Sequence, residues 1–273
     1  MITSASNGRI KEIVNLIQKA KARRERKVFI IEGIRLFLEV PRELFEEIYV
    51  SEAFLEKPEN KALLEGLKYE TVKEDVFRKI SDTKTPQGIL AVVKQPQYSL
   101  EQMLLRSVTG NPDENAKQPL LVVLEDIQDP GNLGTIMRTA EGAGVTGVIM
   151  TRETVDIYNP KTIRSTMGSI FRVPFLYVDD LHETLACLKA NGIMLYAAHL
   201  DGKKLYDDCS YQKGTAFLIG NEGNGLKKDT ADKADAYMKI PMEGKLESLN
   251  AAVATALLVY EAARQRRHVD IKS

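Results

Sequence analysis

Three segments of the chain carry polar side chains of the kinds that bind and orient a substrate. Asn132 and Arg138 belong to the first segment, Glu222 to the second, and Ser248 and Asn250 to the third. Each segment follows an apolar run that reads as a buried strand, so we expect all three at the carboxyl edge of one sheet. Open α/β sheets bind their ligands at that edge.

The first segment leads from Asp126 into an expected helix over 132–143. Asn132 is a residue type that caps helix N-termini, and Arg138 lies six residues later, on nearly the opposite helix face. Taken alone, a helix cap and a surface cation explain these two residues.

The second segment contains three glycines beside Asn221 and Glu222: Gly220, Gly223 and Gly225. Glycine adopts backbone angles closed to other residues and lets a flat ligand approach the main chain. A loop of this kind directly after an apolar strand favours a binding role over a flexible turn.

The third segment begins with Ile240, Pro241 and Met242 and leads into an expected helix over 249–267. Ser248 fits the N-cap of that helix, and Asn250 would present its amide in the first turn. Plain helix capping would also account for these residues if the segment stood alone.

A further glycine-rich stretch, 142–147, matches the G-x-G-x-x-G fingerprint of dinucleotide-binding proteins. In that fingerprint a strand precedes the glycines and a helix follows, so that helix amides meet the pyrophosphate. Here a helix precedes the glycines and a strand follows. We therefore interpret this stretch as a helix end turning into a strand, which argues against a nicotinamide enzyme.

The alternation of apolar runs and helical patterns indicates two α/β domains joined by a linker. Residues 1–94 form the first, residues 95–118 the linker with one short helix near 100–106, and residues 119–273 the second. The second should hold an open, mostly parallel sheet with helices on both faces. Strands are expected at 28–31, 47–50, 69–72, 89–93, 120–124, 145–150, 173–178, 193–198, 215–219 and 236–240. Helices are expected at 10–27, 34–39, 74–80, 132–143, 181–190 and 249–267.

The composition is that of an ordinary globular protein, with 44% hydrophobic and 28% charged residues. No apolar run is long enough to span a bilayer, and the N-terminus lacks the apolar core of a signal peptide. Cys187 and Cys209 show no metal-ligand spacing and are too few for a disulfide framework. We therefore expect no metal and a reducing, cytoplasmic setting.

The net charge is zero, but basic residues gather at both ends of the chain. Residues 1–30 hold eight Lys or Arg against two Glu, and the tail carries Arg264, Arg266, Arg267 and Lys272. Such local basic surface suits phosphate contacts, whereas a solvated helix face explains the charge equally well. The densest basic run contains Arg23, Arg24, Arg26 and Lys27.

Together these residues resemble the three motifs of the SpoU/TrmH family of RNA 2′-O-methyltransferases, in the SPOUT superfamily. The resemblance rests on 132–140, on 220–223, and on 240–242 with 248–250. A further stretch, 164–169, resembles the family's Ser-x-Gly-Ala stretch, with Ser169 where Ala is usual. Residues 29–33 and 85–89 resemble the family's small, L30e-like substrate-binding domain.

The resemblance implies a deep trefoil knot near the C-terminus of the second domain, which is rare among folds. It also implies the cofactor S-adenosylmethionine, held by the backbone of the knotted loops, and an obligate homodimer in which each site is completed by the partner subunit. The implied cofactor-binding positions are Gly220, Asn221, Gly223, Ile240, Met242 and Leu249.

The same resemblance places Arg138 at the ribose hydroxyl, with Asn132 orienting either Arg138 or the ribose. A guanidinium stays protonated in ordinary surroundings, so we predict that Arg138 clamps the target phosphate instead of acting as a base. Glu222 would brace the second loop or pair with a cation, while Ser248 and Asn250 would support the third loop and the cofactor. The expected contacts with the RNA backbone come from Arg23, Arg24, Arg26, Lys27 and Arg164.

Family members with an additional N-terminal domain resemble ribosomal RNA enzymes, so large-subunit rRNA is the preferred substrate. Two alternatives stay open: a tRNA 2′-O-methyltransferase, and a non-catalytic RNA-binding protein of the same fold. The second would be expected to show a broken motif, whereas Arg138, Glu222 and Asn250 are all present.

Overall fold

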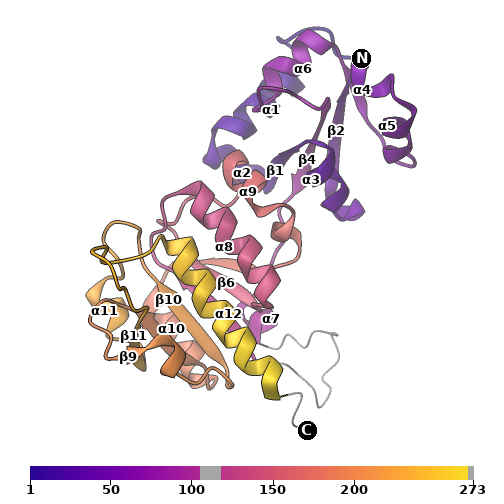
Figure 1. Ribbon diagram of the computed structural model, residues 1–273. Helices are drawn as coiled ribbons and strands as arrows, with labels where there is room; N and C mark the ends of the chain where they lie inside the picture. The colour runs from indigo at the N-terminus through magenta and orange to yellow at the C-terminus, as the bar shows by residue number, and fades with distance from the viewer. Residues whose placement is uncertain (105–117, 270–273) are drawn as a thin grey trace. The chain divides into compact units, whose positions relative to one another are not determined.

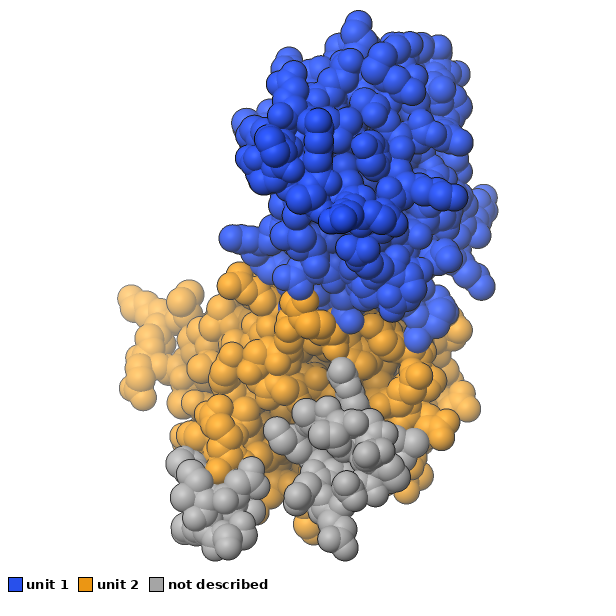
Figure 2. Space-filling view, turned by 90° about the vertical axis from the view of Figure 1, so that its right-hand side faces the viewer, with its two compact units in different colours: residues 1–97, 156–171 blue, residues 98–155, 172–273 orange. Residues whose placement is uncertain are grey.

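The computed structural model describes residues 1–104 and 118–269. They form two compact units, which Figure 2 colours separately: residues 1–97 with 156–171, and residues 98–155 with 172 onward. The predicted boundaries did not anticipate that residues 156–171 pack with the first unit. Most of the predicted linker, residues 105–117, lies outside the described residues.

The first unit is built on a four-stranded sheet in the order β1-β4-β2-β3. Strands β1 and β2 run antiparallel to β4, and β3 runs parallel to β2. The strands are β1 (Val28–Glu32), β2 (Phe45–Ser51), β3 (Glu70–Val72) and β4 (Ile89–Lys94). Helices α1 (Gly8–Gln18) and α6 (Glu74–Ile80) pack their apolar sides, including Ile13 and Phe77, against one face of this sheet.

Helix α3 (Ile34–Glu39) and residues 156–171, which contain α9 (Pro160–Thr166), also pack against strands of this sheet. The ring of Phe29 on β1 lies 4.9 Å from that of Tyr158 and 6.0 Å from that of Phe171. The remaining short helices are α2 (Ala20–Arg26), α4 (Glu52–Leu55) and α5 (Pro58–Leu63).

The second unit contains a seven-stranded sheet in the order β7-β6-β5-β10-β8-β11-β9, and all its pairings are parallel. Its neighbouring strands β6, β5 and β10 are buried along their whole length, as near-continuous apolar runs are when helices cover both faces. The strands are β5 (Leu120–Leu124), β6 (Gly147–Thr151), β7 (Phe175–Val178), β8 (Met194–Ala198), β9 (Lys204–Leu205), β10 (Thr215–Ile219) and β11 (Ala236–Lys239).

Helices α8 (Pro130–Ala143) and α12 (Ala251–Val269) lie side by side on one face of this sheet, as Figure 1 shows. The other face packs against α7 (Leu100–Leu104), α10 (Leu181–Ala190) and α11 (Lys228–Ala231) through a core that includes Met103, Leu121 and Val123. The expected doubly covered, mostly parallel sheet is therefore confirmed. The knot stays a prediction.

Two local expectations have clear outcomes. The helix expected over 10–27 breaks at Lys19, because the Arg23 guanidinium folds back and donates to the carbonyl oxygens of Leu16 and Ile17 at the end of α1. The glycine-rich stretch is the end of a helix, as predicted: Gly144, with a φ of 75°, caps α8, and Gly147 opens β6. Within the described residues, no helix is both long and apolar enough to cross a membrane.

Candidate functional site

The first and second polar segments lie beside each other because β5 and β10 are parallel neighbours. Leu124 pairs in register with Ile219, so the chain leaves both strands at the same edge of the sheet. Residues 125–132 therefore face residues 220–226 at this edge, as expected of loops at the carboxyl ends of parallel strands.

The Glu222 carboxylate joins these two loops. It accepts hydrogen bonds from the backbone N–H of Gln128 (3.0 Å) and Asp129 (3.1 Å), and from the side-chain amide of Asn132 (3.0 Å). Within the described residues no cation pairs with it. Of the two roles predicted for Glu222, the structure places it in the first, as a brace between loops.

Asn132 connects this brace to the third segment. Its side-chain oxygen accepts a hydrogen bond of 2.9 Å from the side-chain amide of Asn250. The expectation that Asn132 caps α8 is wrong: Asp129 is the N-cap and accepts from the Asn132 backbone N–H at 2.8 Å. Asn132 thus lies in the first turn, and its side chain is free to link Glu222 with Asn250.

Asn250 is the residue that caps α12, where Ser248 was expected. Its side-chain oxygen accepts from the backbone N–H of Ala252 (2.9 Å) and Val253 (3.3 Å), while its amide group donates to Asn132. Ser248 is exposed, and its side chain makes no hydrogen bond within the described part of the chain. One side chain therefore fixes the start of α12 and ties it to the first loop.

The environment of Glu222 favours its charged form. Burial raises the pKa of this carboxyl, but the hydrogen bonds from Asn132 and from the backbone of Gln128 and Asp129 outweigh it, and the pKa lies below its ordinary value. At neutral pH the brace is therefore an anion that holds three donors.

The second loop folds tightly on itself. Asn221 and Gly225 exchange backbone hydrogen bonds of 3.1 and 2.9 Å, and the Asn221 side-chain oxygen accepts from the backbone N–H of Gly223 and Asn224. A Cβ at Gly220 would lie 2.1 Å from the Gly225 carbonyl carbon, so this position requires glycine. Of the three loop glycines, Gly225 alone has a positive φ, 68°.

The third loop offers its main chain to a ligand. Among the described residues, no hydrogen bond engages a backbone amide or carbonyl of residues 241–249. Ile240, Met242 and Leu249 are half-buried and supply apolar surface next to these free polar groups. A flat ligand recognised by main-chain hydrogen bonds suits such a loop, because each backbone amide and carbonyl needs a partner once it is covered.

Arg138 is outside this hydrogen-bonded network. It lies exposed on α8, and no hydrogen bond or ion pair engages its guanidinium within residues 1–104 and 118–269. The Asn132 side chain forms its hydrogen bonds with Glu222 and Asn250. It makes no contact with Arg138 within the described residues that would support the expectation that it orients this arginine. Gly142, one helical turn beyond Arg138, lies against Tyr260 of α12.

Two of the four residues of the basic run 23–27 make contacts within the fold. Arg23 is 3% exposed, donates to Asp156 from Nε and Nη2 at 3.0 and 2.6 Å, and caps the end of α1. Arg26 forms ion pairs with Glu12 and Glu46. Arg24 and Lys27 are exposed. Charge in the sequence could not separate these cases, because Asp156 is 133 residues away from Arg23.

Arg164 lies on α9 and pairs with Asp82 at 2.6 Å. Asp82 belongs to a loop that Glu32 holds by accepting from its backbone N–H at 2.9 Å. The same loop ends at Gln87, whose side-chain oxygen accepts from the backbone N–H of Ile34 at 2.8 Å. The two stretches that resemble the family's substrate-binding domain, 29–33 and 85–89, thus meet in the first unit.

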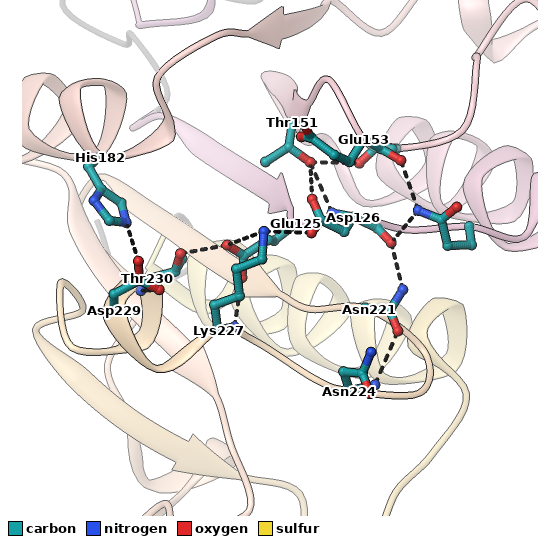
Figure 3. A network of polar contacts seen from close by, with 12 residues as sticks. Glu125, Asp126, Thr151, Glu153, His182, Asn221, Asn224, Lys227, Asp229 and Thr230 are labelled. Atoms are coloured by element: carbon teal, nitrogen blue, oxygen red, sulfur yellow. Dashed lines mark hydrogen bonds and ion pairs between the residues drawn. The ribbon is translucent and has the colours of Figure 1, made fainter.

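Sequence reasoning did not single out Glu125, Thr151 and Lys227, which surround Asp126 behind the first loop (Figure 3). The available signal was the position of two carboxylates, Glu125 and Asp126, directly after a buried strand. Their partners come from distant parts of the chain and could not be read from spacing.

Known proteins match the chain over nearly its whole length. Residues 119–260 match the SpoU rRNA Methylase family, and residues 7–91 match the MRM3-like substrate binding domain. The 23S rRNA (guanosine(2553)-2′-O)-methyltransferase RlmP of Bacillus subtilis (strain 168) is 34% identical over 267 residues, which are 95% of this chain and 97% of that protein.

Two solved structures share the fold. The AdoMet-bound rRNA methyltransferase from Sinorhizobium meliloti aligns with a TM-score of 0.83 and 32% identity over 98% of this chain and 97% of its own. The SpoU methyltransferase AviRb from Streptomyces viridochromogenes aligns with a TM-score of 0.82 and 26% identity over 96% of this chain and 99% of its own. Both alignments span the two units.

Proposed function

The chain belongs to the SpoU rRNA methylase family, and from this premise we propose that it transfers a methyl group from S-adenosylmethionine to a ribose 2′-hydroxyl of RNA. The observation that carries the proposal is the hydrogen-bonded chain from Glu222 through Asn132 to Asn250, which ties the three motif loops into one site. A protein that had lost catalysis would have no need to keep this arrangement intact.

The donor set at the third loop fits the proposed cofactor. Free backbone groups of residues 241–249 and the half-buried side chains of Met242 and Leu249 suit a purine with hydrogen-bonding edges and apolar faces. Gly220, Asn221, Gly223 and Ile240 belong to the same cofactor-binding proposal. When bound, S-adenosylmethionine supplies a methyl group on a positively charged sulfur, which passes to the hydroxyl oxygen as the oxygen loses its proton.

The protein's share of the reaction is positioning. Displacement at a methyl carbon requires the attacking and leaving atoms in line, and holding them there removes much of the barrier. Glu222 fixes the first loop against the second, and Asn250 fixes the third loop against the first. Arg138, with all its donors free, clamps the phosphate beside the target ribose and orients the hydroxyl.

We include a homodimer in the proposal, because α12 leaves apolar side chains uncovered next to Arg138. Val253, Leu257 and Tyr260 repeat at helical spacing and are 49%, 37% and 46% exposed. Tyr260 touches Gly142 on the exposed side of α8, the side from which Arg138 projects. A second copy that covers this face would bury the apolar stripe and carry Arg138 to the partner's site.

Large-subunit rRNA is the proposed substrate. The full-length relative from B. subtilis is named as a 23S rRNA enzyme, and residues 7–91 match a substrate binding domain. Arg24 and Lys27 are the exposed cations of α2 and its C-cap that we assign to the RNA backbone, together with Arg164. Arg23, which is buried, and Arg26, which pairs with Glu12 and Glu46, leave the predicted set. A cytoplasmic location belongs to the same proposal, since both cysteines are free thiols.

The test is transfer of radiolabelled methyl from S-adenosylmethionine to separate pools of unmodified 23S rRNA, 16S rRNA and tRNA. We expect label in 23S rRNA, recovered after alkali as a resistant 2′-O-methylated dinucleotide. Arg138→Ala should lower the rate at least about 100-fold, as loss of a charge-stabilising donor does. Arg78→Ala removes an exposed arginine from α6 and serves as the matched control.

Label in tRNA alone would show that tRNA, and not large-subunit rRNA, is the substrate. Label that is lost in alkali would overturn methylation of the ribose hydroxyl. Absence of label from every pool, with cofactor binding intact, would overturn the enzymatic proposal. Equal loss in Arg138→Ala and Arg78→Ala would remove Arg138 from the site.

A further inference from the structure

Asp126 has a backbone conformation that costs energy and is fixed on every side. Its φ is 58°, in the left-handed region that non-glycine residues seldom adopt. Its backbone N–H donates to the Thr151 hydroxyl at 3.0 Å, and that hydroxyl donates to its carboxylate at 2.8 Å. Its carbonyl accepts from the side-chain amides of Gln128 (3.0 Å) and Asn221 (2.8 Å). A residue held this firmly determines the direction in which the chain continues.

Lys227 supplies the remaining contact. Its ammonium lies 2.7 Å from the Asp126 carboxylate and 3.9 Å from that of Glu125 (Figure 3). Glu125 is 3% exposed and accepts from the Lys227 backbone N–H at 2.8 Å and from the Thr230 hydroxyl at 2.6 Å. Two adjacent carboxylates at the end of β5 therefore hold both the backbone and the side chain of Lys227.

These contacts continue into the proposed active site. Asp126 begins the loop whose amides at Gln128 and Asp129 donate to Glu222, and Lys227 follows the loop that carries Glu222. The Asp126–Lys227 pair thus joins the start of the first loop to the end of the second. The Asp126 carboxylate keeps the pKa of Lys227 above its ordinary value, so the Lys227 ammonium is charged at neutral pH.

We propose that Asp126 and Lys227 are positioning residues for methyl transfer, which act through Glu222 and Asn132 by setting the spacing of the first and second loops. This inference rests on the proposed function and adds a residue at the start of the first loop and one that follows the second. Neither side chain need touch the reacting atoms. Their charge pair aligns the groups that do.

The Lys227 end of the pair is exposed, whereas the Asp126 side chain is only 18% exposed, so removal of Lys227 should alter geometry more than stability. The Lys227 side chain is 58% exposed, and exposed pairs contribute little to folding because solvent screens them. Misplacement of reacting groups by about 1 Å can cost about 100-fold in rate, so a small shift of the first loop is measurable. A cavity of about 230 Å³ borders Lys227 and gives room for the larger side chain in a Lys227→Arg variant.

The experiment compares Lys227→Met with Lys227→Arg and with Lys228→Met in the full chain. Lys228 is the adjacent residue, is 88% exposed, and pairs with Asp232 on its own helix, so its loss removes one charge without touching the loops. We expect Lys227→Met to lower kcat about tenfold with the KM for RNA unchanged, Lys227→Arg to restore most of the rate, and Lys228→Met to match wild type.

Asp126→Asn tests the other side of the pair. Asparagine tolerates the left-handed conformation and keeps hydrogen-bonding capacity towards Thr151, so the charge is the main loss. We expect the double variant Asp126→Asn with Lys227→Met to be no slower than the slower single variant, because the two residues act as a unit. Melting temperatures should stay within about 3 °C of wild type.

A readout independent of catalysis separates this inference from the proposed function. Hydrogen exchange of the Gln128 and Asp129 amides, which donate to Glu222, should be faster in Lys227→Met than in wild type and Lys228→Met. Wild type without methyl transfer would overturn the proposed function, while the exchange rates would still decide the positioning role. Unchanged exchange and unchanged kcat in Lys227→Met, or equal losses in Lys228→Met, would overturn the inference.

Discussion

Helix α12 packs beside α8 in the second unit (Figure 1). Polar networks of opposite character hold its two ends. At its start, Asn250 is exposed and joins Asn132 and Glu222 at the carboxyl edge of the sheet. At its end, Gln265 and Arg266 are half-buried and bind backbone groups of segments at the opposite edge of the sheet. Gln265 also donates to Glu261 of the same helix.

The network at the end of α12 is saturated. Arg266 donates from Nε to Tyr211 at 2.8 Å, from Nη1 to Gln118 at 2.6 Å, and from Nη2 to Pro119 and Lys213 at 3.1 and 2.8 Å, always to carbonyl oxygens. Burial lowers the pKa of Arg266 to about 10, which leaves it charged at neutral pH. Four of its five N–H donors thus hold the helix against the segments that lead into β5 and β10.

The network at the start of α12 is open. Asn132 links Glu222 with Asn250, while Arg138 and the backbone of residues 241–249 have no partner within the described residues. This contrast indicates that a side chain whose hydrogen bonds are made within the chain serves the fold, whereas a side chain left free at an exposed edge is available to ligands. It also predicts which substitutions change stability and which change rate.

Arg266→Met should give the largest effect on stability and leave the reaction intact. Methionine fills a similar volume, but within the described residues it leaves the carbonyl oxygens of Tyr211 and Gln118 without a donor. Those of Pro119 and Lys213 keep a hydrogen bond from Thr215, so the free energy of unfolding should fall by about 2 kcal/mol. Chemical denaturation measures this loss, and kcat per folded molecule should not change. Arg267→Met, at the exposed neighbouring position, is the control. A fall in kcat with stability preserved would reverse the contrast between the two ends.

Asn250→Asp should separate the two tasks of one side chain at the open end. Aspartate caps helices as well as asparagine does, so the bonds from Ala252 and Val253 persist and the melting temperature should hold. The donor to Asn132 is lost and two oxygens face each other, so kcat should fall about tenfold, equivalent to about 1.4 kcal/mol.

Asn250→Ala removes both the cap and the link, and should lose about 1 kcal/mol of stability in addition to rate. Methyl-transfer kinetics and thermal melts of the two variants measure the separation. Full activity of Asn250→Asp would show that the link to Asn132 has no part in the reaction.

The sheet of the second unit could be read from the sequence because its signal is local. The apolar runs 120–124 and 215–219 became β5 and β10 with the same bounds, since burial on both faces demands uninterrupted apolar residues. The short helices α4, α5 and α9 were missed, because segments of four to seven residues hold too few turns to display a periodic pattern.

The side-chain roles were harder to predict than the strands. Both N-caps were assigned to the wrong residue, since Asp, Asn and Ser cap equally well and tertiary partners decide among them. Glu222 draws the Asn132 side chain away from the helix end, and Asp129 takes the cap. In the basic tail, Arg266 binds carbonyls and Arg264 pairs with Glu261, while Lys272 lies outside the described residues.

Glu222→Gln should have the smallest effect on stability of these substitutions. It should also show the pH range over which the Glu222 carboxylate contributes to stability. The pKa of Glu222 is lowered in the folded protein, so its contribution to stability is fully present above the unfolded value of about 4.3 and is lost as pH falls through the lower, folded value. The carboxylate is exposed to solvent, so this contribution is small.

Thermal melts from pH 7 to pH 3 measure it. At pH 7 the melting temperature of wild type should be slightly higher than that of Glu222→Gln, because the variant turns an amide donor toward backbone N–H groups. This difference in melting temperature should shrink as the pH falls below about 4.3. Glu247→Gln, at an exposed position in the third loop, should follow wild type throughout. A difference that persisted at pH 3 would mean that the shape of residue 222 stabilises the fold, and the start of α12 would then resemble its saturated end.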